Sequence, residues 1–309
     1  MQSCKPVYLP KLETWTNVVV VHLVCCEGLN SFPIGDLVKL KQLMIIDCPQ
    51  LEVISWRHHR VSNDGKECVP EGPNRDWIEL RFVELLHNRS LRSIPDFSKC
   101  SNLQTLLVDS SLVEPVNLTS CPALETLQCD HVQSLQYCPK LGSARIAWKF
   151  GRDIPKLEHL PSLLKLEIIR PGPPDSIKRW LSEEEVFLQR YPKATEDLPS
   201  PEISSLTKLH TLHLQQLPMG KLPAGLEAWG SNLRNLNLSG SLLSQVVNFS
   251  TLSNLQKLNM AGTNVKEVRG IDRLTKIDSL DFSYCFRLQT IPDLNRLSKL
   301  EFLSLSHPM

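Results

Sequence analysis

Apolar residues recur at fixed offsets along almost the whole chain. If the first aliphatic residue of each repeat is position 0, aliphatic residues follow at positions 3 and 5, a small or polar residue at position 8, and apolar residues at positions 11 and 14. Four segments follow this pattern throughout, at residues 18–32, 40–54, 80–94 and 277–291. In a second form, at residues 103–116, 209–222, 233–246 and 255–268, the last two apolar residues move to positions 10 and 13. Weaker repeats begin at residues 124, 141, 163 and 300, which gives twelve starts.

The spacing within each repeat predicts one short strand followed by an inward turn. Side chains alternate along a strand, so the residues at positions 3 and 5 lie on one face. Position 8 then faces a small buried site, where Cys, Asn, Thr or Ser helps to satisfy the backbone groups of the turn. A single repeat cannot cover its own apolar face, so strands of neighbouring repeats must stack to form a continuous core.

Most repeat starts are 21 to 24 residues apart, within the range of about 20 to 29 residues that is typical of leucine-rich repeats. We therefore predict a single domain over residues 1–309. It is an α/β solenoid, a leucine-rich repeat horseshoe with a parallel concave β-sheet, an irregular or short-helical convex side and about twelve repeats. Two long intervals predict insertions: a polar loop at residues 55–77, and residues 170–202, with a short helix capped by Asp175.

The composition narrows the classes of partner. A net charge of +1, from 34 basic and 33 acidic residues, provides no concentrated positive charge for nucleic acid or an anionic membrane. The apolar run at residues 18–26 is far shorter than the ~20 residues that span a bilayer, and the residues before it lack the pattern of a secretory signal. We expect a cytoplasmic protein with no nucleic-acid and no membrane partner.

The ten cysteines are expected to be reduced, because their density is far below that of a disulfide scaffold. Cys100, Cys121 and Cys138 each stand three residues before position 0, where other repeats carry leucine. This interchange with leucine predicts that these three cysteines are buried structural residues.

The densest group of reactive side chains lies inside the first predicted insertion and comprises His58, His59, Glu67 and Cys68. A fourth zinc ligand at suitable spacing is missing. No rigid neighbour is identifiable that would orient a Cys/His nucleophile. We therefore predict a solvated loop, no metal, no cofactor and no enzymatic activity.

Two repeats carry near-complete versions of a known pair of alternating motifs, IDSLDFSYCFRLQTIP at residues 277–292 and LQKLNMAGTNVKEV at residues 255–268. With the continuous run at residues 80–106, they make roughly residues 12–305 resemble the leucine-rich-repeat portion of plant nucleotide-binding disease-resistance proteins. The resemblance implies a sensing and autoinhibitory module whose partner is a pathogen effector, a guarded host protein or the receptor's own nucleotide-binding domain. Because no G-x-x-x-x-G-K-[ST] phosphate loop occurs, nucleotide binding is not assigned to this chain.

In a repeat solenoid, the solvent-facing strand residues form the usual partner-binding surface. The predicted binding residues on this concave face are Met44, Ile46, Glu84, Leu86, Leu107, Gln128, Arg145, Glu167, His213, Gln215, Asn237, Asn259, Asp281 and Tyr284. Their character changes from apolar in the N-terminal repeats to polar in the C-terminal ones. The apolar set, together with Val19, Val20 and Val24, either docks against an apolar partner or reflects strand-forming residues at an incompletely covered end.

Three other interpretations remain open. A substrate adaptor of an F-box ubiquitin ligase needs an F-box segment ahead of the repeats, for which residues 1–16 are too short. A truncated gene product that contains only the repeats is the second alternative. An extracellular protein is suggested by sequons at Asn88, Asn117, Asn237 and Asn248. Against it, the repeat ending L-x-G-x-I-P of plant extracellular proteins is lacking, and Asn88 occupies a buried repeat position.

Overall fold

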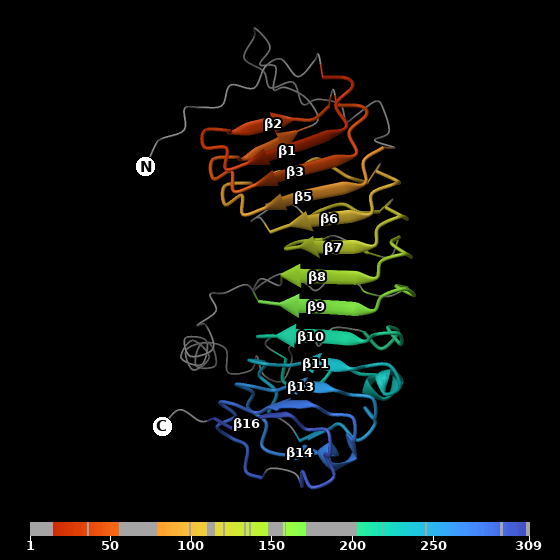
Figure 1. Cartoon of the computed structure of the whole chain (residues 1–309), viewed down its shortest axis with the longest axis vertical. Coiled ribbons are helices and arrows are strands. Elements are labelled where there is room, and N and C mark those ends of the chain that lie inside the picture. The colour runs from red at the N-terminus through yellow and green to blue at the C-terminus, as the bar shows by residue number, and fades with distance from the viewer. Residues whose placement is uncertain are drawn as a thin grey trace. The chain divides into compact units, whose positions relative to one another are not determined.

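The structure, a computed structural model, describes residues 15–35, 37–55, 79–98, 100–109, 115–119, 121–132, 134–135, 137–147, 157, 159–170, 203–217, 219–244, 246–290 and 293–306. The chain divides into two compact units, Met1–Leu141 and Gly142–Met309. Each unit is a stack of coils, and every coil contributes one strand to a parallel sheet (Figure 1).

In the first unit, five described strands pair side by side in chain order, and all pairs are parallel. They are β1 (Val20–Val24), β3 (Gln42–Ile46), β5 (Phe82–Leu86), β6 (Thr105–Val108) and β7 (Thr126–Cys129). Two shorter strands in the return segments of their coils, β2 (Ser31–Pro33) and β4 (Val53–Ser55), also pair in parallel.

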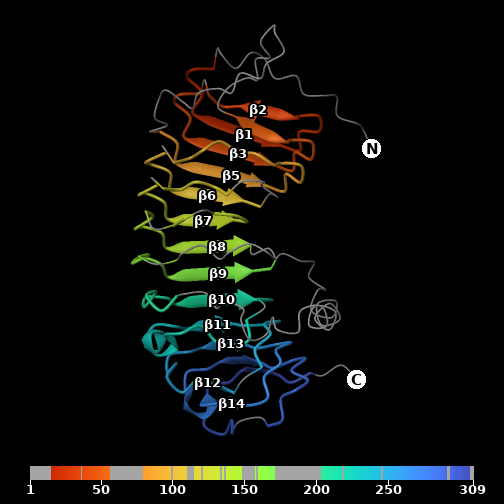
Figure 2. The same ribbon diagram turned by 180° about the vertical axis from the view of Figure 1, so that it is seen from behind.

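The second unit has the same arrangement with seven described strands in its main sheet (Figure 2). They are β8 (Ser143–Ala147), β9 (Lys165–Ile169), β10 (Thr211–Gln215), β11 (Asn235–Asn237), β13 (Lys257–Asn259), β15 (Ser279–Asp281) and β16 (Phe302–Ser304). The return segments contain the parallel pair β12 (Val247–Asn248) and β14 (Val268–Arg269) and the short 3₁₀ helices η2 (Leu226–Trp229) and η3 (Ile271–Arg273).

The core consists of columns of aliphatic side chains from equivalent repeat positions. Strand pairing places Leu43 beside Val83 in the first unit and Leu166 beside Leu212 in the second, and all four side chains are fully buried. Burial of each such side chain contributes ~1.5–3 kcal/mol, and only when the neighbouring coil covers it. The alternation of apolar positions 3 and 5 thus forms the strands that the sequence predicts.

In three repeats, position 8 joins its coil to the preceding one through a buried hydrogen bond. Asn88 donates from Nδ2 to the Ile45 carbonyl at 2.7 Å, and its Oδ1 accepts from the Cys48 backbone N–H at 3.0 Å. Equivalent donations run from Ser241 to the Leu214 carbonyl at 2.8 Å and from Cys285 to the Met260 carbonyl at 3.1 Å. In all three cases the acceptor is position 5 of the preceding repeat. In these three repeats, position 8 therefore carries a small side chain with a donor.

In seven repeats, position 7, directly before this residue, adopts the left-handed backbone conformation. The positive φ angles are 54° at Cys25, 54° at Asp47, 60° at His87, 54° at Gln216, 68° at Gly240, 68° at Gly262 and 59° at Tyr284. This conformation costs non-glycine residues roughly 1–2 kcal/mol. At Gly240 a side chain is also excluded by space, because a Cβ atom would lie 2.9 Å from Gln216 Cγ.

The parallel sheets and stacked coils confirm the predicted leucine-rich-repeat solenoid, and the described return segments contain little helix. Twelve sheet strands mark the twelve predicted starts, but the chain completes about nine turns, slightly fewer than the repeats predicted. Each predicted repeat start is thus followed by one strand of a sheet. Cys100, Cys121 and Cys138 are buried, as predicted. The insertions, with Asp175, lie almost entirely outside the described residues.

Candidate functional site

The open face of each sheet is the candidate binding surface. We define it as the strand side chains at positions 2, 4 and 6, which point away from the buried core. Thirteen of the fourteen predicted binding residues lie there, Arg145 exposed and the others half-exposed. Tyr284 instead occupies position 7, in the turn after β15, where its ring packs edge to face against Phe286 with centroids 6.5 Å apart.

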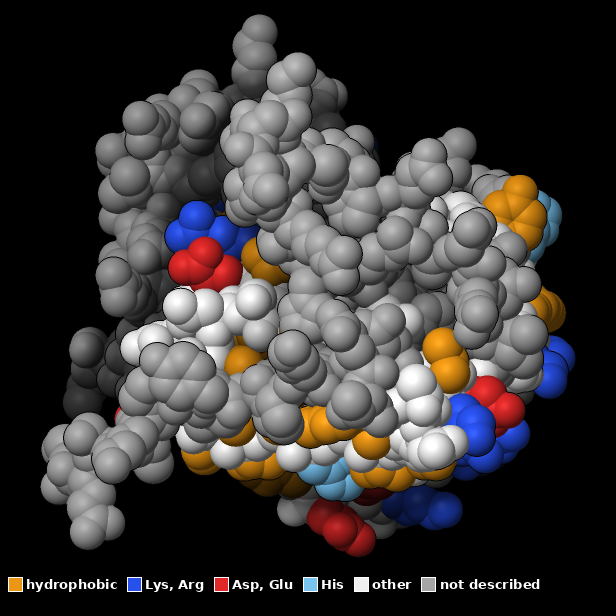
Figure 3. Space-filling view, turned by 90° about the horizontal axis from the view of Figure 1, so that it is seen from above, with side chains coloured by type: hydrophobic (Ala, Val, Ile, Leu, Met, Phe, Trp, Pro, Cys, Tyr) orange, Lys and Arg blue, Asp and Glu red, His pale blue; other side chains and the backbone are white. Residues whose placement is uncertain are grey.

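Apolar residues gather on the open face of the first three sheet strands of the first unit, β1, β3 and β5. Val24, Ile46 and Leu86 lie side by side on β1, β3 and β5, and Met44 lies between His22 and Glu84 in the next row. Val24 is 53% exposed. Figure 3, which views the molecule from above, shows hydrophobic side chains in a band along the lower edge of the visible surface. The predicted apolar character of these repeats is therefore a property of their solvent-facing strand positions.

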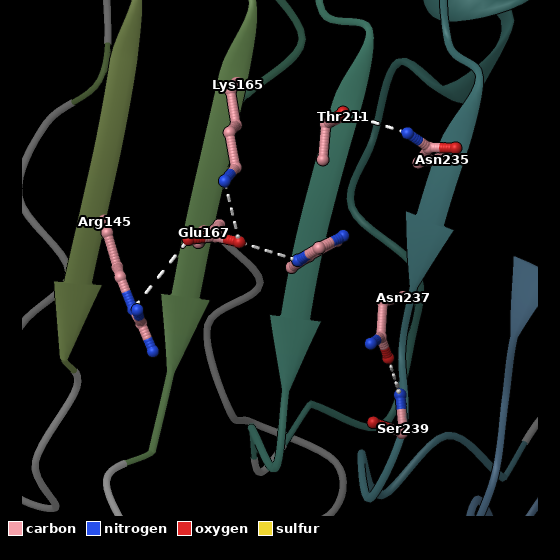
Figure 4. Close-up of polar contacts among 8 residues, drawn as sticks. Arg145, Lys165, Glu167, Thr211, Asn235, Asn237 and Ser239 are labelled. Atoms are coloured by element: carbon pink, nitrogen blue, oxygen red, sulfur yellow. Dashed lines mark hydrogen bonds and ion pairs between the residues drawn. The ribbon is translucent and has the colours of Figure 1, made fainter. Parts of the chain in front are cut away.

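The second unit carries a charged cluster on three adjacent strands (Figure 4). Strand register places Glu167 on β9 between Arg145 on β8 and His213 on β10, and Lys165 lies two residues before Glu167 on the same face. Glu167 Oε1 is 2.9 Å from His213 Nδ1 and 3.3 Å from Lys165 Nζ, and Oε2 is 3.8 Å from Arg145 Nε. We call these four residues the Glu167 cluster.

The Glu167 cluster holds more positive than negative charge. The hydrogen bond from His213 lowers the pKa of Glu167 to about 2, assisted by Lys165 and opposed by burial, so this carboxylate is ionised at neutral pH. Its side chain is only 15% exposed, whereas those of Arg145 and Lys165 are 50% and 46% exposed. The largely buried carboxylate of Glu167 therefore contacts two half-exposed cations, Arg145 and Lys165, and the imidazole of His213.

The position 4 residues on the later strands bond to their own backbone. The side-chain oxygens of Asn237, Asn259 and Asp281 accept the backbone N–H groups of Ser239, Ala261 and Ser283 at 3.0, 2.9 and 2.9 Å (the first pair in Figure 4). Each bond closes a turn directly after a three-residue strand. Three of the predicted binding residues thus cap strand ends, which is a structural role.

Sequence reasoning missed the residues at position 2 of the open face. Lys165 completes the Glu167 cluster, and Asn235 Nδ2 donates to Thr211 Oγ1 at 3.3 Å on the neighbouring strands. The alternation of side chains along the strand, which identified positions 4 and 6, could also have identified these residues, because position 2 lies on the same face of the strand.

Two other kinds of site find no support in the described part of the chain. There, no group of three or more His, Cys, Asp and Glu side chains is arranged to hold a metal ion. Among the same residues, no helix has the length and apolar character that crossing a membrane requires. His58, His59, Glu67 and Cys68 lie outside the described residues.

Comparisons with known proteins identify the fold. No protein-family model matches the sequence, and no curated protein sequence matches it significantly. Among solved structures, the chain is similar to a leucine-rich-repeat protein of Leptospira interrogans, with 20% identity over 96% of this chain and 80% of that chain and a TM-score of 0.50. This likeness and the strand arrangement define the class of protein: the chain has a leucine-rich-repeat fold.

Two further structures match with lower TM-scores. An internalin from Listeria monocytogenes is 14% identical over 95% of this chain and 88% of that chain, with a TM-score of 0.47. A plant peptide hormone receptor, RGFR1 in complex with RGF2, is 14% identical over 88% of this chain and 56% of that chain, with a TM-score of 0.33.

Proposed function

We propose that the chain is a protein-recognition module, not an enzyme, and that the open face of its second unit binds the partner. The observation that carries this proposal is the Glu167 cluster. Hydrogen-bonded strands hold Arg145 and Lys165 in fixed positions, yet these side chains fill no core space and cap no turn. Polar groups that the fold positions at a surface, and whose charge is only partly neutralised there, are suited to meeting a binding partner.

We further propose that the module is the sensing and autoinhibitory part of an intracellular plant immune receptor and acts in the cytoplasm. Support comes from the motifs at residues 255–268 and 277–292 and from the leucine-rich-repeat fold. The partner would then be a pathogen effector, a guarded host protein or the receptor's own nucleotide-binding domain. An F-box substrate adaptor and a gene product that contains only the repeats are the alternatives.

Proximity labelling in plant cells tests the binding face. Substitution of Arg145 by glutamate reverses one charge on the open face, whereas Arg273→Glu makes the same charge reversal on η3, in a return segment. We expect proteins that are labelled by the wild type and by Arg273→Glu but lost with the open-face variant. An identical set of labelled proteins for all three chains would reject the open face as the binding surface.

Sequencing the transcript upstream of the Met1 codon separates the proposed receptor from its alternatives. A phosphate-binding loop in the same reading frame supports the immune receptor. An F-box segment supports the ubiquitin-ligase adaptor, and in-frame stop codons support a gene product limited to the repeats.

A further inference from the structure

We propose that the Glu167 cluster recognises a carboxylate group on an acidic segment of a protein partner. This inference rests on the proposed function and specifies the chemistry of the bound group. Its basis is the charge and geometry of four side chains on β8, β9 and β10.

The first argument is charge complementarity. Two permanent cations, Arg145 and Lys165, share one carboxylate, and His213 donates a third hydrogen-bonding group to that carboxylate. With neutral His213 the cluster carries one net positive charge, and protonation of the imidazole adds a second. A partner anion neutralises this excess charge, and a partner cation would be repelled.

The second argument is the direction of the Arg145 guanidinium. Its contact with Glu167 is made by Nε, at 3.8 Å from Oε2. Among the described residues, the two terminal nitrogens of Arg145 have no other partner, so the planar fork that they form is available to an incoming group. A carboxylate matches such a fork with two parallel hydrogen bonds.

The third argument is the spacing of the two cations. Arg145 and Lys165 stand on adjacent paired strands at positions 4 and 2, which places them diagonally across the gap between β8 and β9. Neighbouring strands are about 4.8 Å apart, and diagonal neighbours on one face are within reach of long side chains. The Arg145 guanidinium and the Lys165 ammonium lie on opposite sides of Glu167 (Figure 4), so each can contact its own carboxylate of one acidic segment.

The surroundings favour a single acidic segment over an extended polyanion. The neighbouring open-face residues Thr211, Asn235 and Asn237 are neutral, and further along the same face the single cation Lys257 is followed by the acidic Asp281. Nucleic acid would require basic residues that continue along the face, because each phosphate contact needs its own cation. A protein segment with one or two carboxylates fits the short extent of the cluster.

The test uses the full chain and a phage-displayed library of short random peptides. Peptides selected by the wild type are sequenced, and one is synthesised with a fluorophore and measured by fluorescence anisotropy. The variant combines Arg145→Gln and Lys165→Gln. The matched control, Lys257→Gln, removes an exposed cation at position 2 of the same face, three strands further along, away from Glu167. Circular dichroism verifies that both variants remain folded.

We expect an excess of Asp and Glu among the selected peptides, binding at least about tenfold weaker in the double variant, and little change in Lys257→Gln, because hydrogen bonds to charged groups dominate the contact. Selected peptides without acidic residues, or an acidic peptide whose Kd is the same in the double variant, would overturn the inference and leave the proposed function standing. Displacement of the peptide by a short single-stranded oligonucleotide would overturn it in favour of nucleic-acid binding. If the wild type selects no peptide and the open-face substitution removes no labelled protein in cells, the proposed function fails as well.

Discussion

Replacing Asn88 by alanine removes a side chain that bridges two coils of the first unit. Asn88 is 1% exposed and bonds both the Ile45 carbonyl and the Cys48 N–H. The substitution leaves the buried Cys48 N–H without this partner, which costs about 1–3 kcal/mol, and removes one bond accepted by the Ile45 carbonyl, which is worth about 0.5–1.5 kcal/mol. We therefore expect the free energy of unfolding to fall by about 1.5–4.5 kcal/mol, a large part of the roughly 5–15 kcal/mol that stabilises most domains.

Urea unfolding followed by circular dichroism measures this loss, with the slope of the transition checked for each variant because coils of a repeat protein can unfold separately. Ser90→Ala is the matched control, since it removes an exposed hydrogen bond of similar length, 2.6 Å to the Pro49 carbonyl. Its expected cost is below about 1 kcal/mol. Asn88→Cys restores a donor of the kind that Cys285 supplies and should fall between the two. An Asn88→Ala variant that loses no more stability than Ser90→Ala would show that position 8 does not join the coils.

Three further predictions concern single positions. Gly240→Ala is expected to lower the free energy of unfolding in urea by at least ~1 kcal/mol, because φ is 68° and the added Cβ meets Gln216. Asp47→Gly, at a φ of 54°, should raise the free energy of unfolding by up to ~1 kcal/mol. Equal and small effects of the two substitutions would refute the argument from backbone conformation. Because its pKa is lowered, ionised Glu167 stabilises the fold by on the order of 3 kcal/mol at most. This contribution is complete above about pH 4.5 and is lost as the pH falls towards about 2. Over this range, the free energy of unfolding should therefore fall by less in Glu167→Gln than in the wild type. Burial raises the pKa of Cys100 to about 12 and that of Cys138 to about 11. A thiol reagent at about pH 8 should therefore modify the exposed Cys25 well before either buried cysteine. Rapid labelling of Cys100 in the folded chain, detected by mass spectrometry, would contradict this prediction.

Much of the fold could be predicted because the core imposes strict periodicity. Leu43 and Ile45 are buried for the reason that the sequence indicates, and Asn88 fills the small polar site expected at position 8. The left-handed backbone at position 7 escaped prediction because chemically unrelated residues such as His87 and Tyr284 occupy it. Coil geometry imposes their φ angle, and glycine marks the position in only some repeats.

The candidate site was predicted in part. Arg145, Glu167 and His213 were selected because they alternate with buried residues along their strands. Their interaction depends on register, which places one residue from each of three coils in a single row. The sequence does not encode the orientation of each side chain, so Lys165 was overlooked although it is 3.3 Å from Glu167.

Position 4 has two physical roles in the second unit, and the distinction decides where binding is expected. On β11, β13 and β15 the side chain is short, and its oxygen caps the backbone two residues later, so its acceptor is already used within its own strand. On β8, β9 and β10 the side chain is longer or aromatic and bonds across strands, and Arg145 uses only Nε for this contact, so its two terminal nitrogens remain for a partner. A polar open face is therefore not a binding face along its whole length. A polar group contributes to affinity only where the fold holds it in place and leaves some of its donors or acceptors unbonded. Partner binding in this unit should accordingly centre on β8 to β10 and weaken towards β15.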